Sequence, residues 1–288
     1  MINYLRRSIK KAEPHKKLIF FLKQLFLVVS KPFFTVFHLP PLENQKAYDQ
    51  PDNPDYAFRM TIIPIIEQTK QLAKLFKKNK LHSMPIVSVA GCSGAGKTHF
   101  ARLFNTILRD EGLNVFLLEQ DNFLQYDGNF NDPMPHINPF LKWKQVHQVM
   151  EEIKKGSTEI TMPFLNRATM PYSIEYRTVN LSEIDVILFE GTYSLGDDDS
   201  YNFFKHCNLG IFLDTSPANS AQWVKDREQN RLPHLQRSPE KLEKDIHAEL
   251  QRYHNYVVPS KKNASFIIYK EKKNKYSVFV LHKNIKND

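Results

Sequence analysis

Cysteine and glycine are scarce in this chain of 288 residues, which has only 2 cysteines and 9 glycines. The two cysteines, Cys92 and Cys207, are too few for a disulfide framework or a cysteine-rich zinc site, and this favours a reducing compartment. The shortage of glycine and of any repeat period excludes collagen-like and solenoid architectures. Hydrophobic residues make up 41% and aromatic residues 12% of the chain, so the composition is that of a globular protein with a sizeable core.

A long uncharged hydrophobic run is also missing. The nearest candidate, residues 18–29, is shorter than the 18 or so residues of a membrane-spanning helix and is interrupted by Lys23. A basic segment precedes it, but Lys31 and Pro32 follow it where a signal peptide would carry small residues. We therefore expect neither a transmembrane helix nor a cleaved signal peptide, and the predicted compartment is the cytoplasm.

The net charge of +9 is unevenly distributed. Residues 1–85 and 261–288 carry +9 and +6, whereas residues 86–260 carry −6. A nucleic-acid enzyme would more often place positive charge on its folded domain, so we expect no nucleic-acid partner. The basic ends either solubilise the chain or bind an anionic surface, and the sequence leaves both interpretations open.

The N-terminal segment has the pattern of an amphipathic helix. Lysine-containing polar pairs recur at 10–11, 16–17 and 23–24, close to two helical turns apart, and leave a broad apolar face. Such a helix could bind an anionic membrane peripherally through residues 1–42, or pack on the rest of the protein or on a second subunit of an oligomer. We assign residues 1–84 to a basic, helical extension with a linker, and residues 85–288 to the main domain.

Strands alternate with helices after Pro85, which predicts an α/β fold with a mostly parallel sheet flanked by helices. Before it, residues 56–80 are predicted to form a helix with a kink or boundary at Pro64. The predicted strands cover residues 86–90, 115–118, 184–189, 209–213, 266–269 and 276–281, and the predicted helices cover residues 97–111, 139–155, 217–229 and 239–257.

The first strand leads into a loop of the Walker A type, G-x-x-x-x-G-K-[ST]. Its residues are Gly91, Cys92, Ser93, Gly94, Ala95, Gly96, Lys97 and Thr98. Glycines let successive N–H groups point at phosphate oxygens, and the following helix N-terminus adds partial positive charge. In this pattern the lysine reaches the β- and γ-phosphates of a nucleotide, and the threonine hydroxyl binds Mg²⁺. The loop therefore predicts a nucleotide-binding site with Thr98 as a metal ligand.

A second signal lies about ninety residues further along the chain. The apolar strand at 185–189 ends in Glu190, and a P-loop enzyme needs a carboxylate in such a place to hold Mg²⁺ or its water ligand. Strands often end in an acidic residue, so the signal depends on the loop that precedes it. We predict that Thr98 and Glu190 together form the metal site.

The sequence resembles the phosphoribulokinase/uridine kinase family of P-loop small-molecule kinases from about Pro85 to Tyr269. The resemblance is carried, in order, by residues 91–98, 118–123, 186–191, 211–214 and 256–268. It implies a P-loop nucleoside triphosphate hydrolase fold, ATP as the phosphate donor and Mg²⁺ as its metal. It also implies a transferase that phosphorylates a hydroxyl of a small metabolite, such as a nucleoside or a sugar derivative.

The resemblance also implies roles for single residues. Asp121 matches the family's carboxylate after the second strand and would be the general base; a turn residue is the alternative. Residues 226–231 resemble the family's lid, in which Arg227 and Arg231 would close on the phosphates. Their alternative is an exposed helix end with i,i+4 pairs. Lys97, Asp121 and Arg227 are therefore the candidate catalytic residues, and Arg231 is a candidate nucleotide ligand.

The chain departs from the family's pattern in two places. In the lid, Trp223 stands where the family often has arginine, and Leu232-Pro233 replaces the usual glycine. In the acceptor loop, the Tyr and His of uridine kinases are missing, and residues 163–170 read Pro-Phe-Leu-Asn-Arg-Ala-Thr-Met. We predict Asn166, Arg167 and Phe140 as acceptor-binding residues, and an arginine among them suits an anionic acceptor.

Two hypotheses of function follow. The first is an ATP-dependent kinase that phosphorylates a hydroxyl of a small molecule. The second is a catalytically impaired nucleotide-binding protein that is tethered to a membrane and acts as an interaction module. The complete set of phosphate-binding residues favours the first, whereas the altered lid and acceptor loop favour the second.

Overall fold

The computed structural model describes residues 61–124, 141–166, 173–199, 201–230, 236–272 and 275–280; residues 271, 272 and 275–280 are described by their backbone alone. The predicted helix within residues 1–42 lies outside the described residues. So do three of the predicted site residues, Phe140, Arg167 and Arg231. Among the described residues, no helix is both long and apolar enough to cross a membrane.

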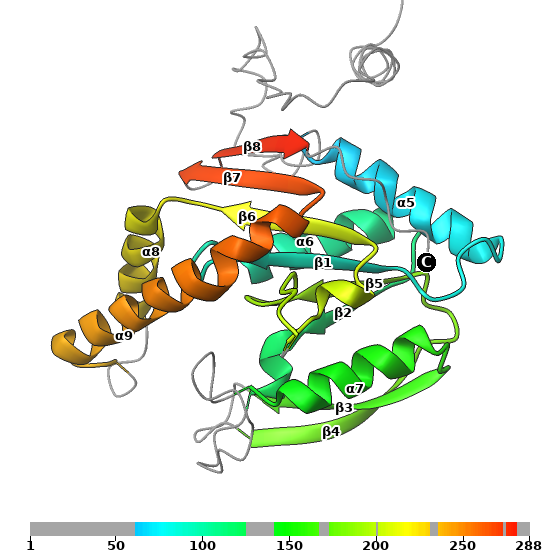
Figure 1. Cartoon of the computed structure of the whole chain (residues 1–288), viewed down its shortest axis with the longest axis horizontal. Coiled ribbons are helices and arrows are strands. Elements are labelled where there is room, and N and C mark those ends of the chain that lie inside the picture. Colours follow the sequence, from blue (N-terminus) through cyan, green and yellow to red (C-terminus); the bar gives the residue numbers. More distant parts are fainter. Residues whose placement is uncertain are drawn as a thin grey trace, which may run out of the picture. The chain divides into compact units, whose positions relative to one another are not determined.

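A six-stranded sheet in the order β2-β5-β1-β6-β7-β8 forms the centre of the part of the chain that the structure describes (Figure 1). All neighbouring strands pair in parallel except β7 and β8, which are antiparallel. This confirms the predicted mostly parallel α/β sheet. The strands are β1 (Ile86–Gly91), β2 (Val115–Glu119), β5 (Val186–Glu190), β6 (Leu209–Asp214), β7 (Phe266–Lys272) and β8 (Lys275–Val280).

Helices flank this sheet, with α6 behind it and α9 crossing in front in the view of Figure 1. Serine caps mark the starts of two of them, because Ser216 and Ser238 accept hydrogen bonds from the N–H groups three residues on. A proline follows each cap at the first helical position. The helices are α5 (Ile63–Lys77), α6 (Lys97–Asp110), α7 (Trp143–Lys154), α8 (Pro217–Gln229) and α9 (Pro239–Arg252).

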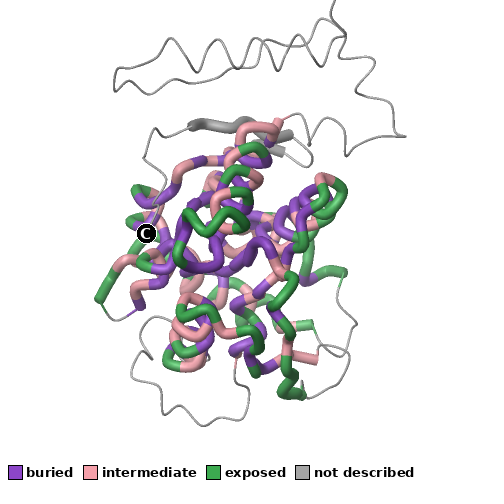
Figure 2. The backbone as a smooth tube through the Cα atoms, turned by 90° about the vertical axis from the view of Figure 1, so that its right-hand side faces the viewer, coloured by how far each residue is buried: buried purple, intermediate pink, exposed green. Residues whose placement is uncertain are grey.

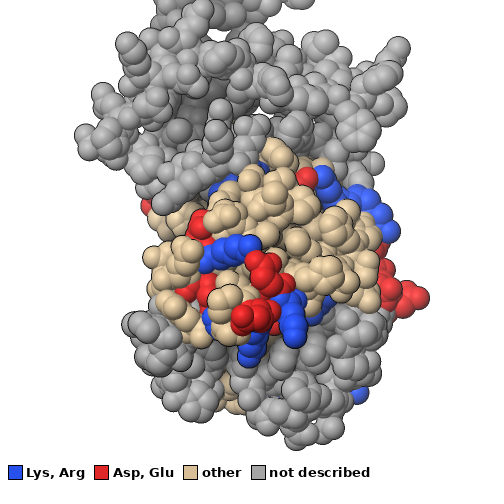
Figure 3. Space-filling view, turned by 90° about the vertical axis from the view of Figure 1, so that its left-hand side faces the viewer, with Lys and Arg blue, Asp and Glu red and all other residues tan. Residues whose placement is uncertain are grey.

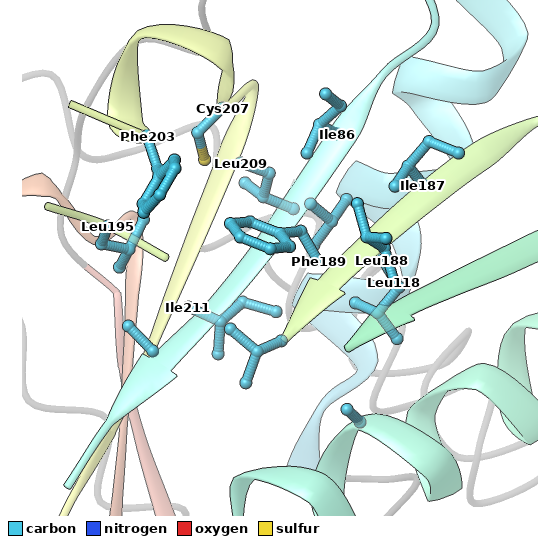
Figure 4. Packing of buried hydrophobic residues seen from close by; sticks show 14 of the residues in the cluster. Ile86, Leu118, Ile187, Leu188, Phe189, Leu195, Phe203, Cys207, Leu209 and Ile211 are labelled. Atoms are coloured by element: carbon cyan, nitrogen blue, oxygen red, sulfur yellow. The ribbon is translucent and has the colours of Figure 1, made fainter. Parts of the chain in front are cut away.

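The core runs through the centre of the described part, where buried residues gather in Figure 2. Strand β1 is buried along its whole length, as expected for a central parallel strand covered on both faces. Figure 4 shows aliphatic and aromatic side chains from β1, β5 and β6 in contact, among them Ile86, Phe189 and Ile211, with Phe203 beside them.

Helix α5, which the sequence placed in the N-terminal extension, packs into this same core. Ile62, Ile65 and Leu72 are fully buried and belong to the cluster that contains the sheet residues. Pro64 stands at the start of the helix rather than at a kink, consistent with its preference for the first turn. Two ion pairs add to the contact, Lys70 with Glu111 at 2.7 Å and Lys77 with Asp185 at 2.9 Å.

A separate two-stranded hairpin, β3 (Glu159–Asn166) and β4 (Ser173–Asn180), lies beside α7 at the lower edge of Figure 1. The strand pattern of the sequence did not include these two strands. The predicted helix at 239–257 also ends earlier, since α9 stops at Arg252 and a π-helical turn, Tyr253–Val257, follows. In this turn the Tyr253 hydroxyl donates a hydrogen bond to Asp214 at the end of β6, which couples the turn to the sheet.

Candidate active site

The phosphate loop connects β1 to α6, as the sequence predicts. At Gly91 φ is +147°, and a Cβ there would lie 2.3 Å from the carbonyl oxygen of Leu213 on the neighbouring strand. At Gly96 φ is +86°, and this left-handed residue is the N-cap of α6. Only glycine meets both conditions without strain. The chain therefore turns sharply enough to direct the first N–H groups of α6 into the loop.

The phosphate loop is stabilised by its own Lys97 and by Ser220 of helix α8. Lys97 is only 8% exposed, and its ammonium donates a hydrogen bond to the carbonyl oxygen of Cys92 at 3.0 Å. Ser220, on α8, donates to the carbonyl oxygen of Ser93 at 2.7 Å, and its hydroxyl lies 2.8 Å from the Cys92 sulfur. The loop is thus preorganised, and α8 is attached to it.

Glu190 and Thr98 meet beside the loop. The Thr98 hydroxyl donates to Glu190 Oε2 at 3.3 Å, although the two residues are far apart in the sequence. The Glu190 side chain is 4% exposed, and this burial raises the pKa of its carboxyl from 4.5 to about 7. The positive charge of Lys97 opposes the rise, whereas the negative charge of Asp121 adds to it. A buried carboxylate next to a hydroxyl is a set of hard oxygen donors that fits Mg²⁺.

Asp121 lies in a short 3₁₀ turn, Gln120–Phe123, directly after β2. Strand β2 pairs with β5 so that Glu119 stands opposite Glu190, and the turn therefore starts at the same edge of the sheet as the metal-site candidates. The Asp121 side chain is exposed, while its charge acts on Glu190. An exposed carboxylate at this edge of the sheet suits a base that an acceptor hydroxyl can reach from solvent.

The neighbouring Gln120 is buried against Gly191, where a Cβ would lie 2.4 Å from the glutamine side chain. Its Oε1 accepts a hydrogen bond from the Tyr193 N–H at 3.2 Å. Its Nε2 has no hydrogen-bond partner among the described residues. Burying an unused donor costs about 1–3 kcal/mol, so this amide is available to a bound oxygen atom next to Asp121.

The acceptor side of the site is approached by the β3–β4 hairpin. Asn122, in the turn that carries Asp121, accepts a hydrogen bond from the Leu165 N–H at 3.3 Å. The next residue, Asn166, ends β3 and donates from its side chain to Glu175 at 3.4 Å. The hairpin is thus tied to the turn that carries the candidate base. The acceptor roles of Asn166, Arg167 and Phe140 stay predictions, and the latter two lie outside the described residues.

The described part of the predicted lid, residues 226–230, lies at the C-terminal end of α8, and ion pairs connect this end to α9 and to Arg237. Arg237 contacts Glu228 at 2.6 Å and Asp245 at 2.9 Å, and Lys225 contacts Glu243 at 2.6 Å. Figure 3 views this side of the molecule, where basic and acidic side chains lie close together.

Arg227 is exposed in the last turn of α8, seven residues after Ser220 and hence about 10 Å further along the helix axis. Its role, and that of Arg231 beyond it, stay predictions.

Sequence reasoning missed several residues that the fold brings to this edge of the sheet. Ser220, Asn122 and Gln120 act through contacts between elements that are distant in the chain. The only local signal was that two of them flank Asp121. A polar residue at the carboxyl end of a parallel strand would have been a usable signal for Lys270 in β7, since ligands bind at that edge of such sheets.

Comparisons with known proteins agree with this arrangement. The sequence model of the Phosphoribulokinase / Uridine kinase family matches residues 86–277, two thirds of the chain. A uridine kinase of Ureaplasma urealyticum is 25% identical over 210 residues, which are 70% of this chain and 96% of that protein. A chromosomal phosphoribulokinase of Cupriavidus necator is 24% identical over 204 residues, which are 61% of this chain and 66% of that protein.

Solved structures show the same fold at lower identity. A D-glycerate 3-kinase from Cryptococcus neoformans is 11% identical, with a TM-score of 0.54, over 72% of this chain and 97% of that one. A phosphoribulokinase from Rhodobacter spheroides is 15% identical, with a TM-score of 0.52, over 67% of this chain and 73% of that one. These two likenesses concern the fold alone.

Proposed function

Because the chain belongs to the Phosphoribulokinase / Uridine kinase family of P-loop kinases, we propose that it transfers the γ-phosphate of ATP to a hydroxyl group of a small metabolite. The observation that carries the proposal is the meeting of Glu190 with Thr98 next to Lys97, at the sheet edge that also carries Asp121. A phosphate-binding loop, a metal-binding pair and a candidate base are the parts that phosphoryl transfer needs.

Each of these residues has a separate task in the proposed reaction. The N–H groups at the start of α6 and the Lys97 ammonium bind the phosphate chain and orient it. Thr98 and Glu190 would hold Mg²⁺, which when bound neutralises negative charge on the phosphates. Asp121 accepts the proton of the acceptor hydroxyl as the hydroxyl oxygen bonds to the γ-phosphorus, and the bond from this phosphorus to the oxygen shared with the β-phosphate breaks to release ADP. Arg227 and Arg231 would approach the phosphates when the lid closes.

The acceptor is proposed at the level of its class. Relatives in Ureaplasma and Cupriavidus bear the names uridine kinase and phosphoribulokinase, so a nucleoside or a sugar derivative is the first class to test. Asp121 is exposed, and the hydrogen bond of Asn122 holds the β3–β4 hairpin beside it. The acceptor would lie between this hairpin and the turn that carries Asp121. Arg167, just after Asn166, would favour an acceptor that carries a phosphate or carboxylate.

A panel of acceptors tests the proposal. Purified protein with ATP and Mg²⁺ is incubated with nucleosides, sugar phosphates and hydroxy acids, and ADP release is followed together with the mass of each acceptor. One acceptor is expected to gain a phosphate. Asp121→Asn should then lower kcat about 10²–10⁴-fold with little change in nucleotide affinity, while the exposed control Asp199→Asn should not. Nucleotide binding without phosphorylation of any acceptor would contradict kinase activity and favour an interaction module.

We also propose that residues 1–42 attach the protein peripherally to anionic membranes. The support is the sequence pattern of this segment, in which eight basic and one acidic residue among the first 31 accompany a broad apolar face. The alternative, packing of this face on the protein or on a second subunit, predicts a different result in the flotation test described below.

A further inference from the structure

We propose that Lys270 is a second phosphate-binding cation of the nucleotide site, delivered by β7 and held in place by Trp223. The proposal rests on nucleotide binding at the loop of residues 91–98, the first part of the function proposed above. It extends that site to a strand on which the sequence analysis placed no functional residue.

The position of Lys270 in the sheet brings it to the correct edge. Strand β7 runs parallel to β6, with Tyr269 opposite Asp214, and β6 runs parallel to β1, with Leu213 opposite Gly91. The residue that follows Tyr269 therefore emerges at the edge where β1 enters the phosphate loop. In open parallel sheets, this carboxyl edge is where ligands bind.

Two features shape the backbone at Lys270. The carbonyl oxygen of Lys270 accepts a hydrogen bond from the Thr215 hydroxyl at 2.9 Å, and Thr215 is 4% exposed. The pairing with β8 also shifts register between Lys270 and Lys272. Such irregularities bend a strand and redirect a side chain, and they are frequent next to active sites.

The side chain is held over the indole of Trp223. The Lys270 ammonium lies 4.3 Å from the centre of this ring, within the range of a favourable cation–π contact. Helix α8 carries Trp223, and its Ser220, one turn earlier, is hydrogen-bonded to the phosphate loop. The indole thus belongs to an element that is fixed to the loop, and it supports the ammonium at a defined place.

That place is next to Gly96. A Cβ built on Gly96 would lie 3.0 Å from the Lys270 nitrogen, and Gly96 immediately precedes Lys97 as the N-cap of α6. An ammonium there adds to the positive potential of the helix N-terminus, where the phosphate chain of a nucleotide binds.

The experiment measures binding in the absence of any acceptor. Isothermal titration calorimetry gives Kd values of the full chain for Mg²⁺–ADP and for inorganic tripolyphosphate. Lys270→Met keeps an unbranched side chain that can still pack on the indole, whereas Lys270→Arg keeps the charge. Lys155→Met, at the exposed C-cap of α7, is the matched control because it makes the same change in net charge.

Lys270→Met is expected to weaken the binding of both ligands about 10–100-fold, the usual effect of losing one charge-assisted hydrogen bond. Lys270→Arg should stay within about threefold of the wild type, and Lys155→Met should not differ from it. In a Trp223→Leu background the effect of Lys270→Met should shrink, since the two side chains act together.

Wild-type affinity in Lys270→Met would overturn the proposal, as would a loss for ADP that tripolyphosphate does not share, because the contact would then not be with the phosphate chain. Absence of phosphotransfer in the acceptor panel would contradict only the proposed kinase activity. A wild-type chain that binds neither ligand would overturn both.

Discussion

Replacing Glu190 by glutamine should stabilise the protein above neutral pH while removing its metal site. Burial raises the pKa of the Glu190 carboxyl from 4.5 to about 7. Between these values the folded carboxyl keeps a proton that the unfolded one has lost, so the free energy of unfolding falls as the pH rises. This difference between the two pKa values lowers the free energy of unfolding by about 3 kcal/mol above pH 7. Glutamine keeps the shape without this cost, and because the pKa of about 7 already includes the favourable charge of Lys97, the expected gain is about 3 kcal/mol.

Urea denaturation at pH 5 and pH 8, without nucleotide or Mg²⁺, measures this difference. Glu190→Gln should be more stable than the wild type by no more than about 1 kcal/mol at pH 5 and by about 3 kcal/mol at pH 8. The matched control is Glu159→Gln, since this glutamate is exposed on the hairpin. Burial lowers the pKa of His206 to about 4, and its protonation destabilises the protein at low pH, but both proteins share this contribution.

Two results would refute the reasoning on Glu190. If the variant is no more stable than the wild type at pH 8, the buried carboxylate does not carry the cost assigned to it. If Glu159→Gln gives the same gain, the effect comes from net charge and not from burial. With Mg²⁺ and ATP present, Glu190→Gln should lose metal-dependent turnover, and an undiminished rate would remove Glu190 from the metal site.

Lys97→Ala should abolish turnover while circular dichroism shows a folded protein, because the loss of one hydrogen bond to Cys92 costs only about 1 kcal/mol; turnover at the wild-type rate would contradict the nucleotide site. Asn122→Leu removes the side-chain oxygen that accepts the hydrogen bond of the Leu165 N–H, and it should raise KM for the phosphate-accepting substrate more than it lowers nucleotide affinity. Asn122→Asp keeps this oxygen and should have the smaller effect. Equal behaviour of both variants would contradict a role of this hydrogen bond in positioning the hairpin. In flotation with anionic liposomes, the full chain should float and a chain starting at Asp55 should not, and raised salt should weaken the binding; if neither floats and the shorter chain aggregates, the N-terminal helix is part of the fold.

Local patterns in the sequence predicted most of the sheet and its connection to the phosphate loop. Strand β1, the loop and α6 were confirmed because their signals, an apolar run, glycines and a helical period, lie within a few neighbouring residues. Helix α8 has the predicted bounds because Ser216 and Pro217 mark its start. Strand β5 begins at Val186, two residues later than predicted, since Ile184 and Asp185 pair with the preceding turn and with residue 114.

Features that depend on tertiary contacts were not predictable in the same way. Apolar and polar residues alternate only weakly in the β3–β4 hairpin, and β4 is mostly exposed. The sequence pattern of these two strands therefore resembles that of a loop. The hydrogen bond between Thr98 and Glu190 shows that two residues paired by motif spacing lie next to each other, while their role as metal ligands stays a prediction. By contrast, the contacts of Ser220 and Lys270 with the phosphate loop depend on how α8 and β7 lie against β1, which no sequence period encodes.

The packing of α5 shows that the folded domain begins earlier in the chain than the similarity to the family. Similarity to the family begins at residue 86, but the apolar stripe of α5 from Ile62 to Ala73 is buried in the shared core. Losing each fully buried isoleucine or leucine from such a core costs about 2–5 kcal/mol, and a domain has only about 5–15 kcal/mol in total. A gene fragment cut at the edge of the similarity would therefore yield an insoluble product, and its failure to bind nucleotide would say nothing about the enzyme.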